Sequence, residues 1–256
     1  MRKLIMASVA LAGALCMSVS QAASGPTGEW TKWQAGNDVT NTASLQRGAG
    51  NFMGYCAGCH SLKYMRYSRM AEDLSMPREQ LDKFLLLPGS KTSDYITTPM
   101  TAADGENWFG KAPPDLSLIT RAKGSDYVYQ FLKTFYLDEK ATTGTNNLAL
   151  AGTSMPHVLS SLQGLQELKL RTEEKTLDDG SVVTESIYEG FELVVPGQLS
   201  SDEYDAFLRD TVNFLEYVGE PYKAKRISLG IWVTLFLLVF TALAYLMKRE
   251  YWRDVE

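Results

Sequence analysis

Strongly apolar stretches stand at both ends of the chain, with a mixed sequence between them. Residues 4–19 are apolar, follow the basic pair Arg2 and Lys3, and are followed by small residues up to Ala22. A basic start, a short apolar run and a small-x-Ala site are typical of a secretory signal peptide. The pattern therefore predicts a signal peptide over residues 1–22, removed together with Cys16. The alternative is a retained N-terminal anchor, but the run is shorter than the ~20 residues that a spanning helix requires.

Residues 227–247 form the second apolar stretch and contain no charged residue. At ~1.5 Å per residue, a helix of this length crosses the hydrocarbon core of a bilayer. A buried core helix that is apolar on every face would be unusual in a domain of this size. Basic residues flank both ends equally, so the signal peptide decides the orientation. We expect residues 23–226 to be exported as one domain, 227–247 to span the membrane, and 248–256 to form a cytoplasmic tail.

Helical periodicity predominates between these ends, so a mainly α fold is expected. Helices are predicted over residues 39–55, from Ser75 to about Leu87, from Ser125 with Val128, Phe131, Leu132 and Phe135 on one face, and from Ser200 with Glu203 as a capping box. Residues 165–176 and 181–195 predict a small β-hairpin around an Asp-Asp-Gly turn. Residues 88–124 and 137–157 show little periodicity and are expected to be long loops of the kind that wrap a ligand.

Composition and charge exclude several classes of protein. With 45% apolar residues, the chain is neither disordered nor collagen-like. The formal net charge of −5 argues against a nucleic-acid binder that relies on a basic surface. Residues 173–192 hold seven acidic residues against Lys175 alone. Such a run is usually a solvated surface, and the other interpretation is that it steers a basic partner.

The motif Cys56-Ala57-Gly58-Cys59-His60 carries the chemistry. Its two thiols are spaced to add across the two vinyl groups of a haem, and the adjacent imidazole then meets the iron. A helical backbone would present all three groups on one face. The motif therefore predicts one covalent haem c, attached through Cys56 and Cys59, with neutral His60 as the fifth ligand.

Other uses of the two cysteines fit less well. A thioredoxin-like CxxC requires a βαβ setting, which the pattern does not show. A zinc site requires a second pair of ligands, yet beyond the predicted signal peptide the chain has no further cysteine and one further histidine, His157. A disulfide between Cys56 and Cys59 would not require His60. Export also favours haem, because bacteria attach it covalently outside the cytoplasm.

The sixth ligand of the iron has three candidates. Met155 lies before Pro156 in a Gly/Thr/Ser-rich loop, unlike a core position; His157 would give bis-histidine ligation; Met100 lies in a second loop. With both axial positions filled by the protein, the haem carries electrons and binds neither oxygen nor substrate. A thioether ligand favours ferrous iron and raises the potential. The residues thus predict a one-electron relay held at the outer face of a membrane, not an enzyme, and they provide no catalytic residue.

The region from Gln46 to Tyr67, around the haem motif, resembles the cytochrome c1 family, the haem subunit of cytochrome bc1 complexes. Further features agree: Ala112-Pro113-Pro114-Asp115-Leu116-Ser117 is similar to that family's PPDLS segment, Ser125-Asp126-Tyr127-Val128-Tyr129 to the start of the following helix, and Gly219-Glu220-Pro221 precedes a single C-terminal anchor. In this order the features are much more specific than CxxCH alone, and they span most of the exported chain.

The resemblance implies a c-type cytochrome haem domain with one C-terminal transmembrane helix, and Met155 as the distal ligand. It places Pro114 along the haem edge and Tyr127 near the haem. It also implies a basic side chain after PPDLS that binds a haem propionate. At the usual position stands Lys123, with Arg121 two residues earlier, and only an arginine offers a bidentate fork to a carboxylate.

The resemblance further implies a place in a bacterial respiratory bc1 complex, in the inner membrane with the haem domain in the periplasm. The partners would be cytochrome b and the Rieske iron–sulfur protein, with a cytochrome c as electron acceptor. The alternatives are an anchored monohaem cytochrome that serves another oxidoreductase, a haem enzyme with an open distal site, and a structural membrane adaptor. A stable association with cytochrome b would distinguish a bc1 subunit from a cytochrome that serves another oxidoreductase, and the absence of carbon monoxide binding would distinguish it from a haem enzyme.

Overall fold

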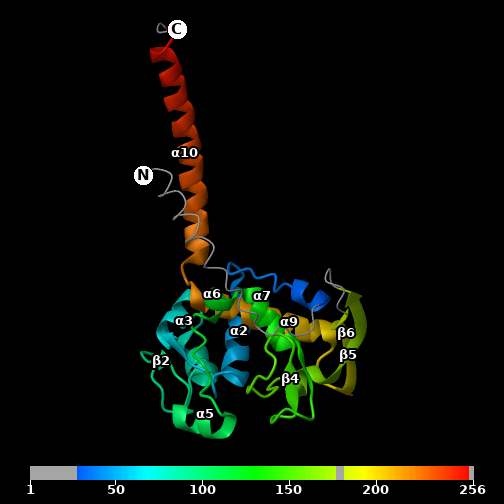
Figure 1. The fold of residues 1–256 in the computed structure, drawn as a ribbon. Coiled ribbons are helices and arrows are strands. Elements are labelled where there is room, and N and C mark those ends of the chain that lie inside the picture. Colours follow the sequence, from blue (N-terminus) through cyan, green and yellow to red (C-terminus); the bar gives the residue numbers. More distant parts are fainter. Residues whose placement is uncertain (1–27, 177–181, 254–256) are drawn as a thin grey trace, which may run out of the picture.

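The computed structural model describes residues 28–176 and 182–253, which form a helical head and one long projecting helix (Figure 1). The predicted signal peptide lies outside the described residues. The elements are η2 (Glu29–Lys32), α2 (Thr42–Tyr55), β1 (Leu62–Arg66), α3 (Tyr67–Asp73), α4 (Arg78–Gln80), η3 (Leu81–Leu85), β2 (Tyr95–Ile96), α5 (Ala102–Phe109), α6 (Ile119–Lys123), α7 (Ser125–Lys133), β3 (Phe135–Leu137), β4 (Thr145–Asn147), α8 (Ser160–Gln163), β5 (Gly164–Thr176), β6 (Val182–Pro196), α9 (Ser201–Gly219) and α10 (Lys223–Tyr251).

The pair α2 and α9 forms the centre of the head. Both helices begin at polar residues: the Asn41 side chain accepts a bond from the Ser44 amide, and Ser200 and Glu203 form the predicted capping box of α9. The helices approach closely at Gly48, where an added Cβ would lie 2.0 Å from the Asp210 carbonyl oxygen. The sequence places a residue without a side chain where two backbones meet.

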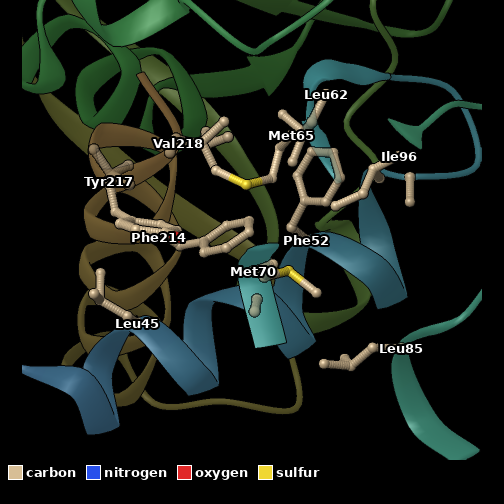
Figure 2. Close-up of a cluster of buried hydrophobic side chains, with 14 of the residues drawn as sticks. Leu45, Phe52, Leu62, Met65, Met70, Leu85, Ile96, Phe214, Tyr217 and Val218 are labelled. Atoms are coloured by element: carbon tan, nitrogen blue, oxygen red, sulfur yellow. The ribbon is translucent and has the colours of Figure 1, made fainter. Parts of the chain in front are cut away.

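The hydrophobic core surrounds this helix pair. Figure 2 shows Phe52 of α2 facing Phe214 of α9, and their ring centroids are 6.0 Å apart. Met65 of β1 and Ile96 of β2 close the same cluster, and both are almost fully buried. Because α2 is packed in this core, the position of Cys56, the first residue of the haem motif after the helix, is fixed.

Strands occur as three antiparallel pairs among the described residues, namely β1–β2, β3–β4 and β5–β6. The longest pair confirms the predicted hairpin, with Leu165 opposite Val195 and Thr176 opposite Val182. The predicted turn falls within residues 177–181, outside the described residues. The hairpin lies at one side of the head, and α5 lies at the end farthest from α10 (Figure 1).

Several predicted boundaries are wrong. Ser75 does not cap a helix; it has φ +53°, and the next helix begins at Arg78 after Pro77 and continues as a π-helical turn. Phe135 lies in β3, beyond the end of α7. The expected loop 88–124 contains β2, α5 and α6, and the loop 137–157 contains β4. These short elements have too few residues for a periodic signal and form through contacts with distant segments.

Helix α10 contains the predicted apolar stretch 227–247 and extends beyond it at both ends. It is the one helix in the described part of the chain that is long and apolar enough to cross a membrane, and all of its residues in 227–247 are exposed. Two ion pairs join its first turn to the end of α9, Lys223 with Glu216 and Arg226 with Glu220. The helix is therefore attached to the head through charged contacts near its N-terminal end.

Candidate functional site

The cysteine motif lies in a tight turn directly after α2. The Cys56 and Ala57 amides both donate to the Phe52 carbonyl, and the Cys59 and His60 amides both donate to the Cys56 carbonyl, at 2.8–3.0 Å. We expected a helical backbone here, and this was wrong, because α2 ends at Tyr55. The turn folds the motif back on itself, so both thiols and the imidazole belong to one compact structure at the end of a buried helix.

His60 is held in one tautomer. Its Nδ1 lies 2.7 Å from the carbonyl oxygen of Pro114, and the side chain is 8% exposed. A carbonyl oxygen only accepts, so Nδ1 carries the proton and Nε2 keeps its lone pair. Burial lowers the pKa of His60, partly offset by the Pro114 bond and the charge of Asp115. The imidazole is thus neutral, oriented and able to bind a metal through Nε2.

The segment around Pro114 is attached to the motif by further bonds. The Leu116 amide donates to the Ser61 carbonyl at 2.9 Å, and the Asp115 carboxylate accepts from the Lys63 amide at 2.9 Å. Asp115 also accepts from the Ser117 amide. Two segments whose bonded residues are more than 50 positions apart in the sequence therefore lie side by side. Asp115 belongs to the PPDLS-like segment, and its carboxylate connects the two segments.

Both thiols of the motif are free and partly buried. Burial and the charge of Cys59 raise the pKa of Cys56 to about 12, and burial also raises the pKa of Cys59. Redox-active CxxC pairs have the opposite property, a lowered thiol pKa. Within residues 28–176 and 182–253, no three His, Cys, Asp or Glu side chains cluster as a metal site would require. The donor set of two thiols and one neutral imidazole fits a covalently attached haem better than a dithiol catalyst or zinc.

Met155 is partly buried and packs against the edge of the hydrophobic core, to which Cys56 and Tyr127 also contribute. Its amide donates to the Thr153 hydroxyl at 3.3 Å. The loop that carries it begins at Asn147, whose amide side chain is fully buried. Sequence reasoning missed Asn147; the Asn-Asn pair before a Gly/Thr/Ser-rich loop was the available signal.

The other two candidates for the sixth ligand lie differently. His157 is 8% exposed, and its ring stacks on Phe135 at a centroid distance of 4.9 Å and an interplanar angle of 5°. The Met100 sulfur lies 3.6 Å from the position that a Cβ on Gly105 would take, and that position is 2.6 Å from Pro113. Met100 thus lies beside the segment that binds His60.

Arg121 and Lys123 have different surroundings. Arg121 Nη1 lies 3.5 Å from Glu220 Oε2 at the end of α9. Lys123 Nζ lies 5.8 Å from the ring centroid of Tyr127, and among the described residues no carboxylate pairs with Lys123. Lys123 and Tyr127 also border an open polar pocket, which neither the cysteine motif nor Met155 lines.

The chain is similar to known proteins over much of its length. The model of the "Cytochrome C1 family" matches residues 88–182 and 198–255. The chain is 46% identical to cytochrome c1 of Allochromatium vinosum over 255 residues, 100% of both chains. It is 41% identical over 218 residues to the ammonia monooxygenase gamma subunit of Nitrosomonas europaea, covering 85% of this chain and 86% of that protein. It is 27% identical to cytochrome c1 of Rhodospirillum rubrum, covering 83% and 82%.

Proposed function

Since this chain belongs to the cytochrome c1 family, it is an electron-carrying subunit of a bc1-type complex with a covalent haem c, and we propose that it relays single electrons from a Rieske iron–sulfur protein to a cytochrome c. The predictions of a haem c, of this family and of a chain that is not an enzyme on its own are confirmed. The anchor-like helix α10 and the bacterial relatives indicate a membrane-anchored protein.

The proposed attachment uses both thiols of the motif and the imidazole beside them. Cys56 and Cys59 would form the thioethers, and His60 Nε2 would bind the iron. These residues would hold a haem that supplies one-electron chemistry between the ferric and ferrous states. The observation that carries this proposal is the bond that His60 Nδ1 donates to the Pro114 carbonyl oxygen. It fixes the ring and leaves the lone pair of Nε2 free to bind the iron.

Met155 is the proposed distal ligand. Met155 and Cys56 are both partly buried and pack against the hydrophobic core, whereas His157 is stacked on Phe135 and Met100 lies beside Pro113. If His60 and Met155 both bound the iron, no position would stay open for oxygen or a substrate, and the site would only transfer electrons. The neutral thioether favours the ferrous state and raises the potential.

The partners and location follow from the same proposal. Cytochrome b would contact the chain within the membrane, along residues 227–247 in α10. The head over residues 23–226 would lie in the periplasm of a bacterial inner membrane, after removal of residues 1–22, and residues 248–256 would lie in the cytoplasm. No nucleic acid is involved.

Covalent haem attachment is tested by serine substitution of both motif cysteines. In the variant Cys56→Ser/Cys59→Ser we expect complete loss of covalent haem, because a hydroxyl does not form the thioether. The measurement is haem staining after denaturing electrophoresis of membranes, with a pyridine haemochrome spectrum for haem type. Cys16→Ser is the control and should stain normally. Staining of the double variant at the level of the parent protein would refute the attachment.

A second candidate function comes from the relative named as an ammonia monooxygenase gamma subunit. Under this alternative, the present chain would be an anchored monohaem cytochrome that serves an oxidoreductase other than the bc1 complex. Gentle solubilisation of the tagged full chain distinguishes the two: co-purification of cytochrome b supports the bc1 interpretation, and its absence from an intact preparation supports the alternative.

Lys123 is the proposed partner of a haem propionate, because Arg121 is paired with Glu220. Loss of a cation near the haem favours ferric iron, so Lys123→Gln should lower the midpoint potential by a shift on the order of tens of millivolts. The control is Arg121→Gln, which removes an equal charge and should leave the potential nearly unchanged. A redox titration measures both, and a larger shift in the Arg121 variant would assign the contact to that residue.

A further inference from the structure

The Met155 loop is fixed at its start by a buried side-chain amide. Asn147 Nδ2 donates to the Phe131 carbonyl at 2.7 Å, at the end of α7. Its Oδ1 accepts from the Ala149 amide at 2.9 Å and from the Leu150 amide at 3.2 Å. The residue is fully buried. One side chain therefore joins the first turn of the loop to the C-terminus of a helix.

A neighbouring asparagine holds the next part of the loop. Asn146 Oδ1 accepts from the Gly152 amide at 2.8 Å, and its Nδ2 donates to Asp138 at 2.8 Å. The Gly152 amide lies three residues before Met155. The bonds of Asn146 and Asn147 thus extend along the loop towards the methionine.

The far end of the loop is fixed by stacking. His157 lies against Phe135, and Phe135 in turn lies edge-on to Phe131 with centroids 5.2 Å apart. Phe131 also stacks with Tyr127. Since the Phe131 carbonyl is the acceptor of Asn147, both ends of the loop are attached to consecutive elements, α7 and β3.

We propose that Asn147 and His157 are positioning residues that hold the Met155 thioether on the haem iron. This rests on the proposed function, in which Met155 is the distal ligand. A free loop would lose conformational entropy each time the thioether bound the iron. With both ends already attached, little of that entropy remains to be lost, so the ligand-bound state is favoured. The buried amide of Asn147 holds the start of the loop, and the stacked ring of His157 holds its end.

The test uses the full chain in its membrane complex and two readouts of the methionine bond. These are the rate of carbon monoxide binding to the ferrous haem and the methionine–iron charge-transfer band of the ferric haem. In Asn147→Ala the methionine-off population should rise about tenfold, since a buried partner left unpaired changes an equilibrium by roughly that factor. Carbon monoxide binding should accelerate by the same factor. Asn146→Ala, a partly exposed position, serves as the milder second variant and should show a smaller increase.

Asn213→Ala is the matched control. Asn213 is 3% exposed, and its amide donates to the Asp38 carbonyl and the Ser44 hydroxyl, at the junction of α2 and α9. It should lower thermal stability as Asn147→Ala does, with no change in carbon monoxide binding. His157→Phe, which keeps a stacked ring, should retain the parent rate, and His157→Ala should not.

The outcomes distinguish failure of the positioning role from failure of the Met155 ligand assignment. If Asn147→Ala and Asn146→Ala bind carbon monoxide no faster than Asn213→Ala, the positioning role is overturned while Met155 stays the ligand. If Met155→Leu keeps the charge-transfer band, the ligand assignment itself fails. A Met155→Leu variant that loses the band, together with an accelerated Asn147→Ala variant, supports both proposals.

Discussion

Replacing Met155 with leucine should lower the midpoint potential of the haem by an amount on the order of hundreds of millivolts, since axial ligands set haem potentials over a range of ~0.8 V. Leucine has a similar volume but no sulfur, so the iron loses the neutral ligand that favours its ferrous state. Electron acceptance from a high-potential donor then becomes unfavourable, and quinol oxidation by the complex should nearly stop. A spectroscopic redox titration of purified membranes measures the shift.

Met100→Leu is the matched control for this experiment. The Met100 sulfur packs near Gly105 and Pro113, beside the segment that binds His60, so we expect a potential close to that of the parent protein. An unchanged midpoint in Met155→Leu would remove Met155 as a ligand. A large drop in Met100→Leu instead would exchange the two assignments.

Gly48→Ala should destabilise the head by about 3 kcal/mol or more, at or beyond the upper end of what overpacking usually costs. A Cβ at this position would lie 2.0 Å from the Asp210 carbonyl oxygen and 2.7 Å from the Phe214 Cβ, so α2 and α9 must move apart. The haem motif follows α2 directly, and we therefore expect less covalent haem as well. Thermal unfolding of the purified full chain and haem staining measure the two effects.

Gly50→Ala tests whether this cost comes from the close approach. Gly50 lies in the same helix, and nothing lies within 4 Å of a Cβ there. Alanine at this exposed position should stabilise the helix by up to ~1 kcal/mol through its higher helix propensity. Equal destabilisation by both substitutions would contradict the packing explanation.

Features with a local cause could be predicted from the sequence. The Ser200–Glu203 capping box, the two strands of the hairpin and the apolar helix α10 depend on residues a few positions apart, and all three are present. The haem motif is equally local, because the spacing of its thiols is determined by the chain itself. Even so, the local pattern gave a helical backbone for Cys56-Ala57-Gly58-Cys59-His60, where the structure has a turn.

Contacts between distant segments could not be predicted in this way. The haem motif with Cys56, Cys59 and His60 and the membrane-spanning stretch 227–247 could be predicted, because each is encoded in consecutive residues. The bond that fixes the His60 tautomer comes from Pro114, and the buried amide of Asn147, at the end of β4, binds the Phe131 carbonyl in α7. Only the tertiary structure determined these partners. Folding brings together groups that are far apart along the chain, and such contacts produce no periodic pattern in the sequence.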